Sequence, residues 1–178
     1  MTTDDWRPLL VLVSGAPGSG KTTLARELAV ALGLPHLNRD EIWSGLRFTL
    51  RRGAPESIRS RGIVAEYGAI EHMLAIGVSL VADGTMYLGE FEHHVRRLCD
   101  LGEVVNVHCR STDAEERYRA RELAKDQPKA EFDRKMKRLP EIWPQVLDPL
   151  DLPCRLIEVS NESGYDPTVA EIVSLLSP

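Results

Sequence analysis

The chain lacks any apolar run that approaches the roughly 18 residues needed for a transmembrane helix. Its first five residues are acidic and lack the positively charged and apolar regions of a signal peptide. These two absences argue against secretion and against a membrane protein. We therefore expect a cytoplasmic protein.

Cysteine is scarce, and the chain shows none of the spacings typical of metal sites. Cys99, Cys109 and Cys154 are odd in number and form no C-x-x-C pair, and the five histidines show no metal-ligand spacing. This pattern excludes a disulfide framework and a zinc site, and it suits a reducing compartment.

The chain also has no excess of positive charge. It carries 22 Lys and Arg against 27 Asp and Glu, a formal net charge of −5. Such a surface offers no strong field for a polyanion, although a local basic patch can still bind one, so nucleic acid is a less favoured partner. The 178 residues, 43% of them hydrophobic, predict a single domain over residues 1–178.

What the chain does contain is the run Gly15-Ala16-Pro17-Gly18-Ser19-Gly20-Lys21-Thr22, which fits the phosphate-binding pattern G-x-x-x-x-G-K-[ST]. Apolar residues 9–13 predict a buried strand before it, and Leu24, Leu28 and Leu32 predict a helix over residues 22–32. Glycines let the backbone wrap a phosphate with its N–H groups inward, and the helix dipole adds positive potential. We therefore expect residues 15–22 and Thr23 to bind ATP, with Lys21 on the outer phosphates and Thr22 on Mg²⁺.

Further strands are predicted at residues 35–38, 78–83, 103–109 and 155–159, and helices at 41–46, 58–74, 88–100, from about 113, and around 169–176. This alternation predicts an α/β protein: a three-layer α/β/α P-loop NTPase fold with a five-stranded parallel sheet. Functional loops then lie at the carboxyl ends of the strands. Residues 125–153 contain five prolines and the basic cluster 134–138, and we expect a mobile segment and an irregular connection there.

Two missing motifs narrow the class of nucleotide-binding protein. No N-K-x-D sequence, which reads the base in GTPases, occurs in the chain. The strand at 78–83 ends Asp83-Gly84-Thr85 without the second carboxylate expected of a transport or AAA-type ATPase. A short chain with an arginine-bearing helix after its fourth strand favours a phosphotransferase.

Residues 15–22, Asn38-Arg39-Asp40-Glu41 and residues 81–85 resemble, in this order, the P-loop kinases related to polynucleotide 5′-kinase. That group includes the zeta-toxin, chloramphenicol phosphotransferase and gluconate kinase families, and the resemblance covers most of the chain. It implies that Asp40 accepts the proton of the attacking hydroxyl. It also implies a helical lid at about residues 112–139, whose arginines close over the triphosphate.

Elementary chemistry supports Asp40 independently of the resemblance. Phosphoryl transfer needs a hydroxyl held in line with the γ-phosphate and a carboxylate that orients it. A carboxylate just beyond the second strand lies at the edge of the sheet near the phosphate loop. The alternative is that Asn38 or Asp40 only caps the helix that follows.

Three other residues are candidates for the acceptor and metal sites. Asp83 ends an apolar run, where it either contacts Mg²⁺ or substrate, or only forms a turn before Gly84. Thr85 lies at the same edge of the sheet. Trp43 stands where the related polynucleotide kinases carry an arginine for the acceptor phosphate, and its ring either stacks on a base or sugar, or fills the core.

Arg117 and Arg121 are spaced i, i+4 and share one helix face, whereas Arg119 lies on the other side. We expect one of the first two to neutralise charge on the leaving phosphoryl group. The alternative is an exposed helix held by salt bridges, because glutamates alternate with the arginines.

The sequence thus predicts an ATP- and Mg²⁺-dependent phosphotransferase acting on a hydroxyl of a small molecule. One alternative is a 5′-hydroxyl kinase for nucleosides or polynucleotides, which Arg47, Arg51, Arg52 and the cluster 134–138 support locally. A second alternative is a nucleotide-binding regulatory module without kinase activity.

Overall fold

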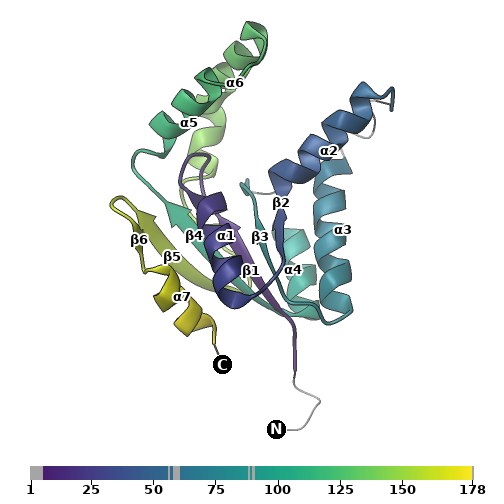
Figure 1. Cartoon of the computed structure of the whole chain (residues 1–178), viewed down its shortest axis with the longest axis vertical. Helices are drawn as coiled ribbons and strands as arrows, with labels where there is room; N and C mark the ends of the chain where they lie inside the picture. The colour runs from purple at the N-terminus through teal and green to yellow at the C-terminus, as the bar shows by residue number, and fades with distance from the viewer. Residues whose placement is uncertain (1–5, 56, 58–60, 88, 90, 178) are drawn as a thin grey trace.

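The first strand, β1 (Leu9–Ser14), lies inside a six-stranded sheet with the order β2-β3-β1-β4-β5-β6 (Figure 1). This computed structural model describes residues 6–55, 57, 61–87, 89 and 91–177. Four strands run parallel to β1 or to its neighbours, namely β2 (His36–Asn38), β3 (Leu80–Asp83), β4 (Glu103–Arg110) and β5 (Arg155–Asn161). The predicted five parallel strands are therefore confirmed.

The sixth strand, β6 (Tyr165–Asp166), was not predicted. It pairs antiparallel with β5 after a turn at Gly164, where φ is 120°. Two residues are too few to show an alternating pattern, which is why the sequence did not reveal this strand. The sheet is therefore mixed rather than wholly parallel.

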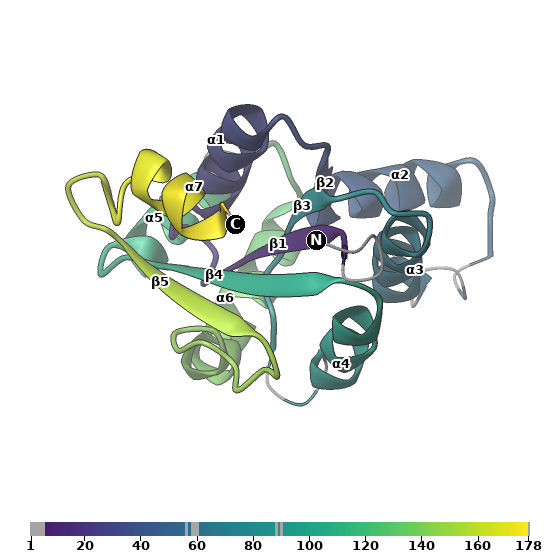
Figure 2. The ribbon, with the colours of Figure 1, turned by 90° about the horizontal axis from the view of Figure 1, so that it is seen from below.

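Side chains of β1 alternate between two cores, one on each face of the sheet. Val11 and Val13 pack under helices α1 (Lys21–Leu32) and α7 (Val169–Leu176), whereas Leu10 and Leu12 pack under α3 (Gly62–Ala75) and α4 (Glu92–Leu101). Figure 2 shows the sheet between these two pairs of helices. A parallel strand buried on both faces reads as a continuous apolar run, which explains residues 9–13.

Some helix ends follow local chemistry. Helix α1 ends at Gly33, whose left-handed backbone (φ 65°) donates its N–H to carbonyls of the last turn. Thr168 and Glu171 form a reciprocal capping box at the start of α7. Helices α3 and α4 begin later than predicted, at residues 62 and 92, and Ile58, assigned to the first of them, lies outside the described residues.

Helix α2 (Arg39–Arg51) is longer than the predicted segment 41–46. The expected irregular segment at 125–153 is wrong in its central part, because residues 129–142 form a regular helix, α6 (Lys129–Ile142), followed by the short 3-10 turn η2 (Trp143–Gln145). The prolines suggested breaks, yet Pro128 only precedes α6 and Pro140 falls in its last turn. The basic cluster 134–138 therefore lies on a helix.

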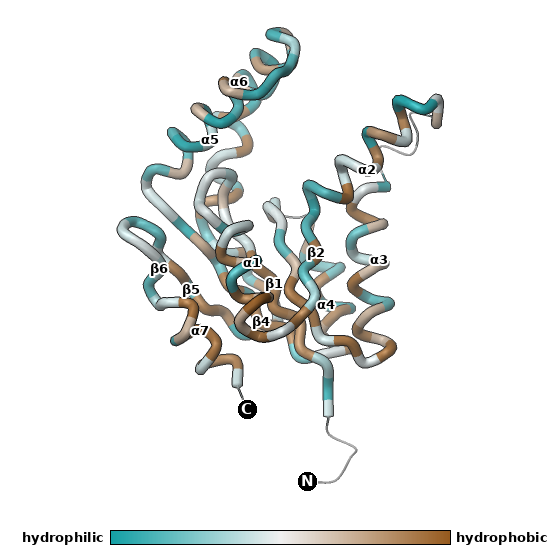
Figure 3. Tube along the Cα trace, in the orientation of Figure 1, coloured by the Kyte–Doolittle hydropathy of each residue, from teal (hydrophilic) through white to brown (hydrophobic). Residues whose placement is uncertain are grey.

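Two helical arms rise beyond the carboxyl ends of the strands (Figure 1). One arm is α2, and the other consists of α5 (Ala114–Leu123) and α6. Hydrophilic residues predominate on these two arms, and hydrophobic residues on the sheet below them (Figure 3). Helices α5 and α6 stand where the lid was predicted. Among the described residues, no helix is both long and apolar enough to span a bilayer.

Candidate active site

A cleft of about 510 Å³ opens at the carboxyl edge of the sheet, between α2 and the α5–α6 arm. It is polar, and its walls come from four separate parts of the chain. Eight of the residues predicted for the site line it: Pro17, Lys21, Thr22, Asp40, Trp43, Asp83, Thr85 and Arg121. Residues far apart in the sequence are thus brought to one place, as expected for an α/β sheet edge.

Glycines shape the phosphate loop because other segments approach its backbone closely. A Cβ on Gly18 (φ 90°) would lie 2.1 Å from the carbonyl oxygen of Ala114, and a Cβ on Gly20 (φ 98°) would lie 2.3 Å from Nδ2 of Asn161. No other residue type fits both the backbone angle and the space. The loop is therefore packed between the start of α5 and the end of β5.

Side chains from β4, β5 and β6 also hold the loop in place. Asn161 Nδ2 donates to the Ser19 carbonyl over 2.8 Å, and the Tyr165 hydroxyl donates to the Gly20 carbonyl over 3.2 Å. Cys109 Sγ lies 3.3 Å from the same Ser19 oxygen and is fully buried. The loop is thus fixed by tertiary contacts that its own motif does not contain.

Lys21 extends into the cleft with little to neutralise it. Its Nζ lies 3.4 Å from the Ala16 carbonyl, and it forms no ion pair with a carboxylate among the described residues. Burial lowers the pKa of its ammonium to about 8, although the negative charges of Asp83 and Asp40 partly oppose the shift. A polyphosphate would supply the counter-charge that the protein does not.

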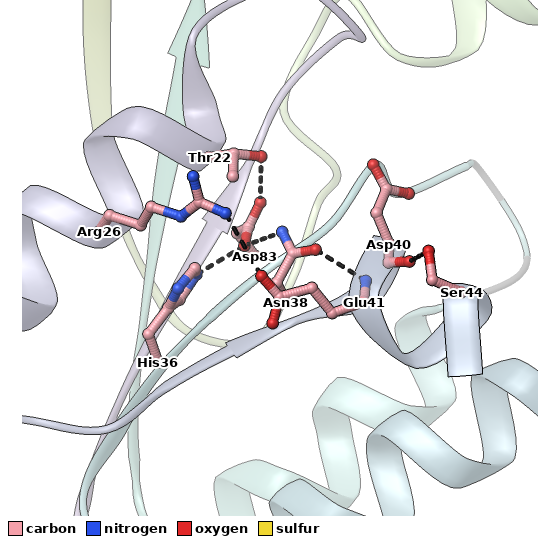
Figure 4. A network of polar contacts seen from close by, with 8 residues as sticks. All are labelled: Thr22, Arg26, His36, Asn38, Asp40, Glu41, Ser44 and Asp83. Carbon is pink, nitrogen blue, oxygen red and sulfur yellow. Dashed lines mark hydrogen bonds and ion pairs between the residues drawn. The ribbon is translucent and has the colours of Figure 1, made fainter. Parts of the chain in front are cut away.

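Asp83 is the centre of a buried hydrogen-bond network (Figure 4). Its carboxylate accepts from Thr22 Oγ1 at 2.6 Å and from Asn38 Nδ2 at 2.7 Å, and His36 Nε2 lies 2.7 Å away. Burial alone raises the pKa of this carboxyl, but these hydrogen bonds outweigh burial and leave the pKa below its usual value. Asp83 therefore remains ionised.

The two residues predicted for the metal are direct neighbours, since Thr22 donates to Asp83. The described residues contain no cluster of three or more His, Cys, Asp or Glu. Such a sparse donor set fits Mg²⁺ rather than zinc, because Mg²⁺ usually takes one or two protein oxygens and completes its shell with water and substrate phosphates.

Asn38, not Asp40, caps helix α2. The Asn38 side chain accepts from the backbone N–H of Glu41 at 3.0 Å, so the capping alternative is correct for Asn38 and wrong for Asp40. Asp40 follows in the first turn with an exposed side chain that lines the cleft. In Figure 4 the Asp40 carboxylate makes no contact with the other residues drawn, apart from the bond that Ser44 donates to its backbone carbonyl.

The arginines of α5 divide as their spacing predicts. Arg117 and Arg121 line a hollow of about 180 Å³ together with residues of the phosphate loop, whereas Arg119 pairs with Glu115 at 2.6 Å. Arg117 lies 3.6 Å from Asp113, and Arg121 stands over the Tyr118 ring at 5.7 Å. Only Arg121 of the two also lines the main cleft, so it joins the phosphate loop to the acceptor side.

Trp43 packs against α3 and also lines the cleft, so stacking on a base or sugar stays a prediction. A Cβ on Gly62 would lie 2.6 Å from its ring, so one edge of the indole packs closely on α3. The side chain is half-buried and also lines the cleft. Thr85 lines the cleft too, and its carbonyl accepts a hydrogen bond from Arg39.

A buried ion pair that was not predicted from the sequence supports the α2 side of the cleft. Arg39 Nε lies 2.5 Å from a Glu66 oxygen, and the Arg39 guanidinium sits 4.5 Å from the Phe91 ring centre. The pair joins α2 to α3. A signal was present, because Glu66 occupies a position of the apolar face formed by Ile63, Tyr67 and Ile70, where an unpaired carboxylate is unfavourable.

A second missed group braces the α5–α6 arm. Glu122 is buried and pairs with Lys125 and, at 2.9 Å, with Lys135, which also reaches Gln127 at 2.8 Å. These hydrogen bonds hold the pKa of Glu122 below its usual value despite burial, which raises it. Residues 125–128, which fall inside the predicted lid, therefore form the turn between two helices tied by ion pairs.

A strand, a glycine-shaped loop and a helix with a partly buried lysine at its start define a P-loop nucleotide-binding protein. The chain belongs to the AAA domain family AAA_33, which matches residues 10–142. The family match spans the phosphate loop, the Asn38–Asp83 network and helices α5 and α6, so it confirms the nucleotide-binding assignment.

Comparison with known proteins supports the same fold. The chain is similar to a Chloroflexus aurantiacus J-10-fl structure described as a "putative kinase", with a TM-score of 0.71 and 21% identity over 96% of this chain and 97% of that chain. It is also similar to a gluconokinase from Sinorhizobium meliloti 1021, with a TM-score of 0.53 and 21% identity over 94% and 88%. A curated relative, the cytidylate kinase of Pyrobaculum aerophilum, is 55% identical over 40 residues, which are 22% of this chain and 19% of that protein.

Proposed function

We propose that this protein transfers the γ-phosphoryl group of ATP, bound with Mg²⁺, to a hydroxyl of a small molecule. The observation that carries the proposal is one cleft into which the phosphate loop, the Asp40 carboxylate and Arg121 all face. These are the three kinds of group that phosphoryl transfer needs: a phosphate cradle, a group that orients the hydroxyl, and mobile positive charge.

The phosphate loop would hold the triphosphate. Its backbone N–H groups and the start of α1 face the β- and γ-phosphates, and the Lys21 ammonium neutralises their charge. Thr22 and Asp83 would hold Mg²⁺, which supplies electrostatic stabilisation of the phosphate oxygens when bound. Asp83 already fixes the Thr22 hydroxyl over 2.6 Å, so this corner is preorganised.

Asp40 would act on the acceptor. The acceptor oxygen forms a bond to the γ-phosphorus while the bond to the β–γ bridging oxygen breaks, and ADP leaves. The proton of the acceptor hydroxyl passes to the Asp40 carboxylate. The Asp40 carboxylate is exposed and does not cap α2. It lies close enough to Lys21 for its negative charge to oppose the lowering of the Lys21 pKa. Both properties suit this role.

The lid arginines would stabilise the charge that develops on the transferred group. Arg121 is the stronger candidate because it lines both the hollow beside the phosphate loop and the acceptor cleft. Arg117 lies one turn earlier on the same face and is partly neutralised by Asp113. We therefore assign the main role to Arg121 and a supporting role to Arg117.

The relatives favour a kinase. Two similar proteins are described as kinases, one of them a gluconokinase, and a third likeness is to a short segment of a cytidylate kinase. At 21% identity or over 40 residues, these likenesses leave the acceptor of this chain to experiment. A small hydroxylated acceptor suits the volume of about 510 Å³ and the polar lining of the cleft.

A 5′-hydroxyl kinase for nucleosides or polynucleotides is the second candidate. The cationic residues of α2 and α6 favour it, whereas Trp43 and the net charge of −5 oppose a polynucleotide. Turnover on an oligonucleotide would fall steeply with added salt, because phosphate contacts release counterions. A rate on a small alcohol that does not change with salt would favour the first proposal.

The test is transfer of labelled γ-phosphate from ATP to a panel of hydroxylated metabolites by wild type and Asp40→Asn. We expect transfer by wild type and about a 10²- to 10³-fold loss in Asp40→Asn, with unchanged affinity for a non-hydrolysable ATP analogue. Asp133→Asn is the matched control, because Asp133 is exposed on α6 and pairs only with Lys129 in the described chain. Full activity in Asp40→Asn would contradict the assignment of the base.

A regulatory module without kinase activity is the third candidate, and the same assay separates it from the others. Such a module would bind the ATP analogue but transfer no phosphate to any acceptor in the panel. ATP consumption would then not depend on added acceptor.

A further inference from the structure

The inner face of α2 forms a continuous stripe along the acceptor side of the cleft. Asp40, Trp43, Ser44 and Arg47 are spaced i, i+3, i+4 and i+7, which places them on one face of a helix, and all four line the cleft. The stripe begins with the carboxylate assigned to the reacting hydroxyl. It ends with a guanidinium two turns further out.

Most cations that line the cleft already have a carboxylate partner. Arg39 pairs with Glu66, and Lys125 and Lys135 share Glu122. Among the described residues, the cleft-lining cations without such a partner are Lys21, Arg121 and Arg47. The first two also line the hollow beside the phosphate loop, so they are committed to the triphosphate. Arg47 remains.

Arg47 is positioned rather than loose. Its Nη2 donates to Ser44 Oγ over 3.2 Å, and the Ser44 hydroxyl donates to the Asp40 carbonyl over 2.8 Å. Figure 4 shows the Ser44–Asp40 part of this chain of bonds. Ser44 therefore links the Arg47 guanidinium to the backbone of Asp40, so the two ends of the stripe are connected by hydrogen bonds.

We propose that Arg47 binds an anionic group, a carboxylate or a phosphate, on the acceptor, at the end opposite its reacting hydroxyl. The acceptor is then an elongated hydroxylated anion that lies along α2 with its middle against Trp43. Arg47 lies seven positions after Asp40, which corresponds to about 10 Å along the helix axis. This distance sets the length expected of the acceptor. This inference rests on the proposed function, since it takes Asp40 to mark the reacting end.

The charge of the whole protein makes such a site selective. The chain is acidic, with a net charge of −5, yet six cationic and three anionic side chains line this cleft within the described residues. A cleft with the opposite sign to its surroundings concentrates anions. A guanidinium binds a carboxylate or a phosphate through two parallel hydrogen bonds, whereas a neutral polyol makes no comparable contact.

Trp43 provides a probe that does not require the natural acceptor. In a Trp6→Phe/Trp143→Phe background, Trp43 is the one tryptophan left of the three in the chain. With the nucleotide site saturated by Mg²⁺ and a non-hydrolysable ATP analogue, inorganic phosphate and acetate are titrated while Trp43 emission is recorded. Phosphate reports a phosphate-binding subsite, and acetate reports a carboxylate-binding one.

We expect saturable binding of at least one of these anions, weakened tenfold or more by Arg47→Gln. Arg52→Gln is the matched control and should leave binding unchanged, because Arg52 lies at the end of the same helix, against Phe48 and outside the lining of the cleft. Equal binding in wild type and Arg47→Gln would overturn the proposal. So would a protein that binds the ATP analogue but neither anion, and in that case the kinase proposal would stand.

The acceptor assay gives a second readout. Panel compounds are compared as pairs, such as D-glucitol with D-gluconate and cytidine with its 3′-monophosphate, which keeps the 5′-hydroxyl free. The anionic member should have the higher kcat/KM, and Arg47→Gln should raise its KM while changing kcat little. A neutral compound phosphorylated best, with the same KM in Arg47→Gln, would overturn the subsite while leaving the kinase proposal intact.

Discussion

The two walls of the cleft are built in different ways. The phosphate wall is backbone: glycines at left-handed angles, carbonyls bonded to Asn161 and Tyr165, and a loop packed on Ala114. The acceptor wall is made of side chains on α2, where Asp40, Ser44 and Arg47 are exposed. Hydropathy follows the same division, since the arms are hydrophilic and the sheet beneath the loop is hydrophobic (Figure 3).

If the proposed function is correct, this difference separates the residues of catalysis from those of acceptor specificity. Changes in the phosphate wall disturb packing as well as phosphate binding, because the loop is part of the core. Changes on the exposed face of α2 alter the acceptor site at little cost in stability. The phosphate wall can therefore be constant while the acceptor wall sets the substrate, as expected when function is carried by loops and faces on a common fold.

The largest effect should come from the phosphate wall. Lys21→Ala should lower kcat/KM about 10³-fold, because the charge of the transition state loses a fixed counter-charge. Its thermal unfolding temperature should change little, since Nζ has one weak contact, with Ala16 at 3.4 Å. Steady-state phosphate transfer measures the first effect and calorimetry the second.

Lys129→Ala is the matched control for Lys21→Ala, because Lys129 is exposed and pairs with Asp133. Its activity should equal that of wild type. If Lys21→Ala kept a tenth of wild-type activity, the phosphate wall would not work as described.

The next effect concerns the arm between the two walls. Arg121→Gln should lower kcat about 10²-fold, and Arg117→Gln less, because Arg121 alone of the two lines both the phosphate hollow and the main cleft. Arg119→Gln, whose wild-type side chain pairs with Glu115, should leave kcat unchanged. Single-turnover transfer at saturating ATP makes the comparison, and an equal loss at all three positions would contradict it.

Asp83 allows a test of stability. Asp83→Asn should reduce the free energy of unfolding by about 3 kcal/mol, because a buried carboxylate that accepts three hydrogen bonds is replaced by an amide with donors of its own. Urea denaturation without nucleotide measures this difference. Asp133→Asn, on an exposed helix face, should change stability by less than about 0.5 kcal/mol.

The pH dependence of that difference follows from the lowered pKa of Asp83. The carboxylate stabilises the folded state at pH values above about 4, where an unfolded aspartate is ionised. This contribution is lost as the pH falls through the lower folded pKa. The gap between wild type and Asp83→Asn should therefore narrow in acid, and a gap that widened would contradict the network.

The smallest expected effect is the pH dependence of nucleotide binding. Burial lowers the pKa of Lys21 to about 8. Affinity for the Mg²⁺–ATP analogue should therefore fall several-fold between pH 7 and pH 9, as the free protein loses the ammonium charge. The affinity of Lys21→Ala for the analogue should not change with pH in this range. Calorimetric titration measures the affinity of both proteins.

The lowered pKa of Lys21 also predicts how the free energy of unfolding changes with pH in the absence of nucleotide. An unfolded lysine keeps its proton to about pH 10.4, whereas folded Lys21 releases it near pH 8. The unfolded state binds more protons in this interval, so the contribution of Lys21 to unfolding free energy should rise with pH there. Lys21→Ala should remove that rise.

The sequence was most informative where chemistry and position are local. The phosphate loop, the strand before it and the helix after it could be predicted because the motif, the apolar run and the i, i+4 leucines lie next to one another. The face shared by Arg117 and Arg121 was predicted for the same reason. The stripe on α2 follows the same helical spacing, but the sequence did not show that it faces a cleft.

Pairs distant in the sequence could not be predicted. The Arg39–Glu66 ion pair, the bond from Asn161 to Ser19 and the contacts of Asp83 join residues between 27 and 142 positions apart. The irregular segment expected from residue 125 was wrong over α6 for a different reason. Prolines are breakers by local propensity, and they are harmless at the ends of this helix.

By itself, the sequence determined that this protein has a phosphate loop on an α/β framework, because backbone angles and periodicity are properties of neighbouring residues. Only the tertiary structure decided which residues share the cleft and which cation is left for an acceptor. Burial, pairing and pKa depend on what the folded chain brings within a few ångströms, and sequence order does not record that distance.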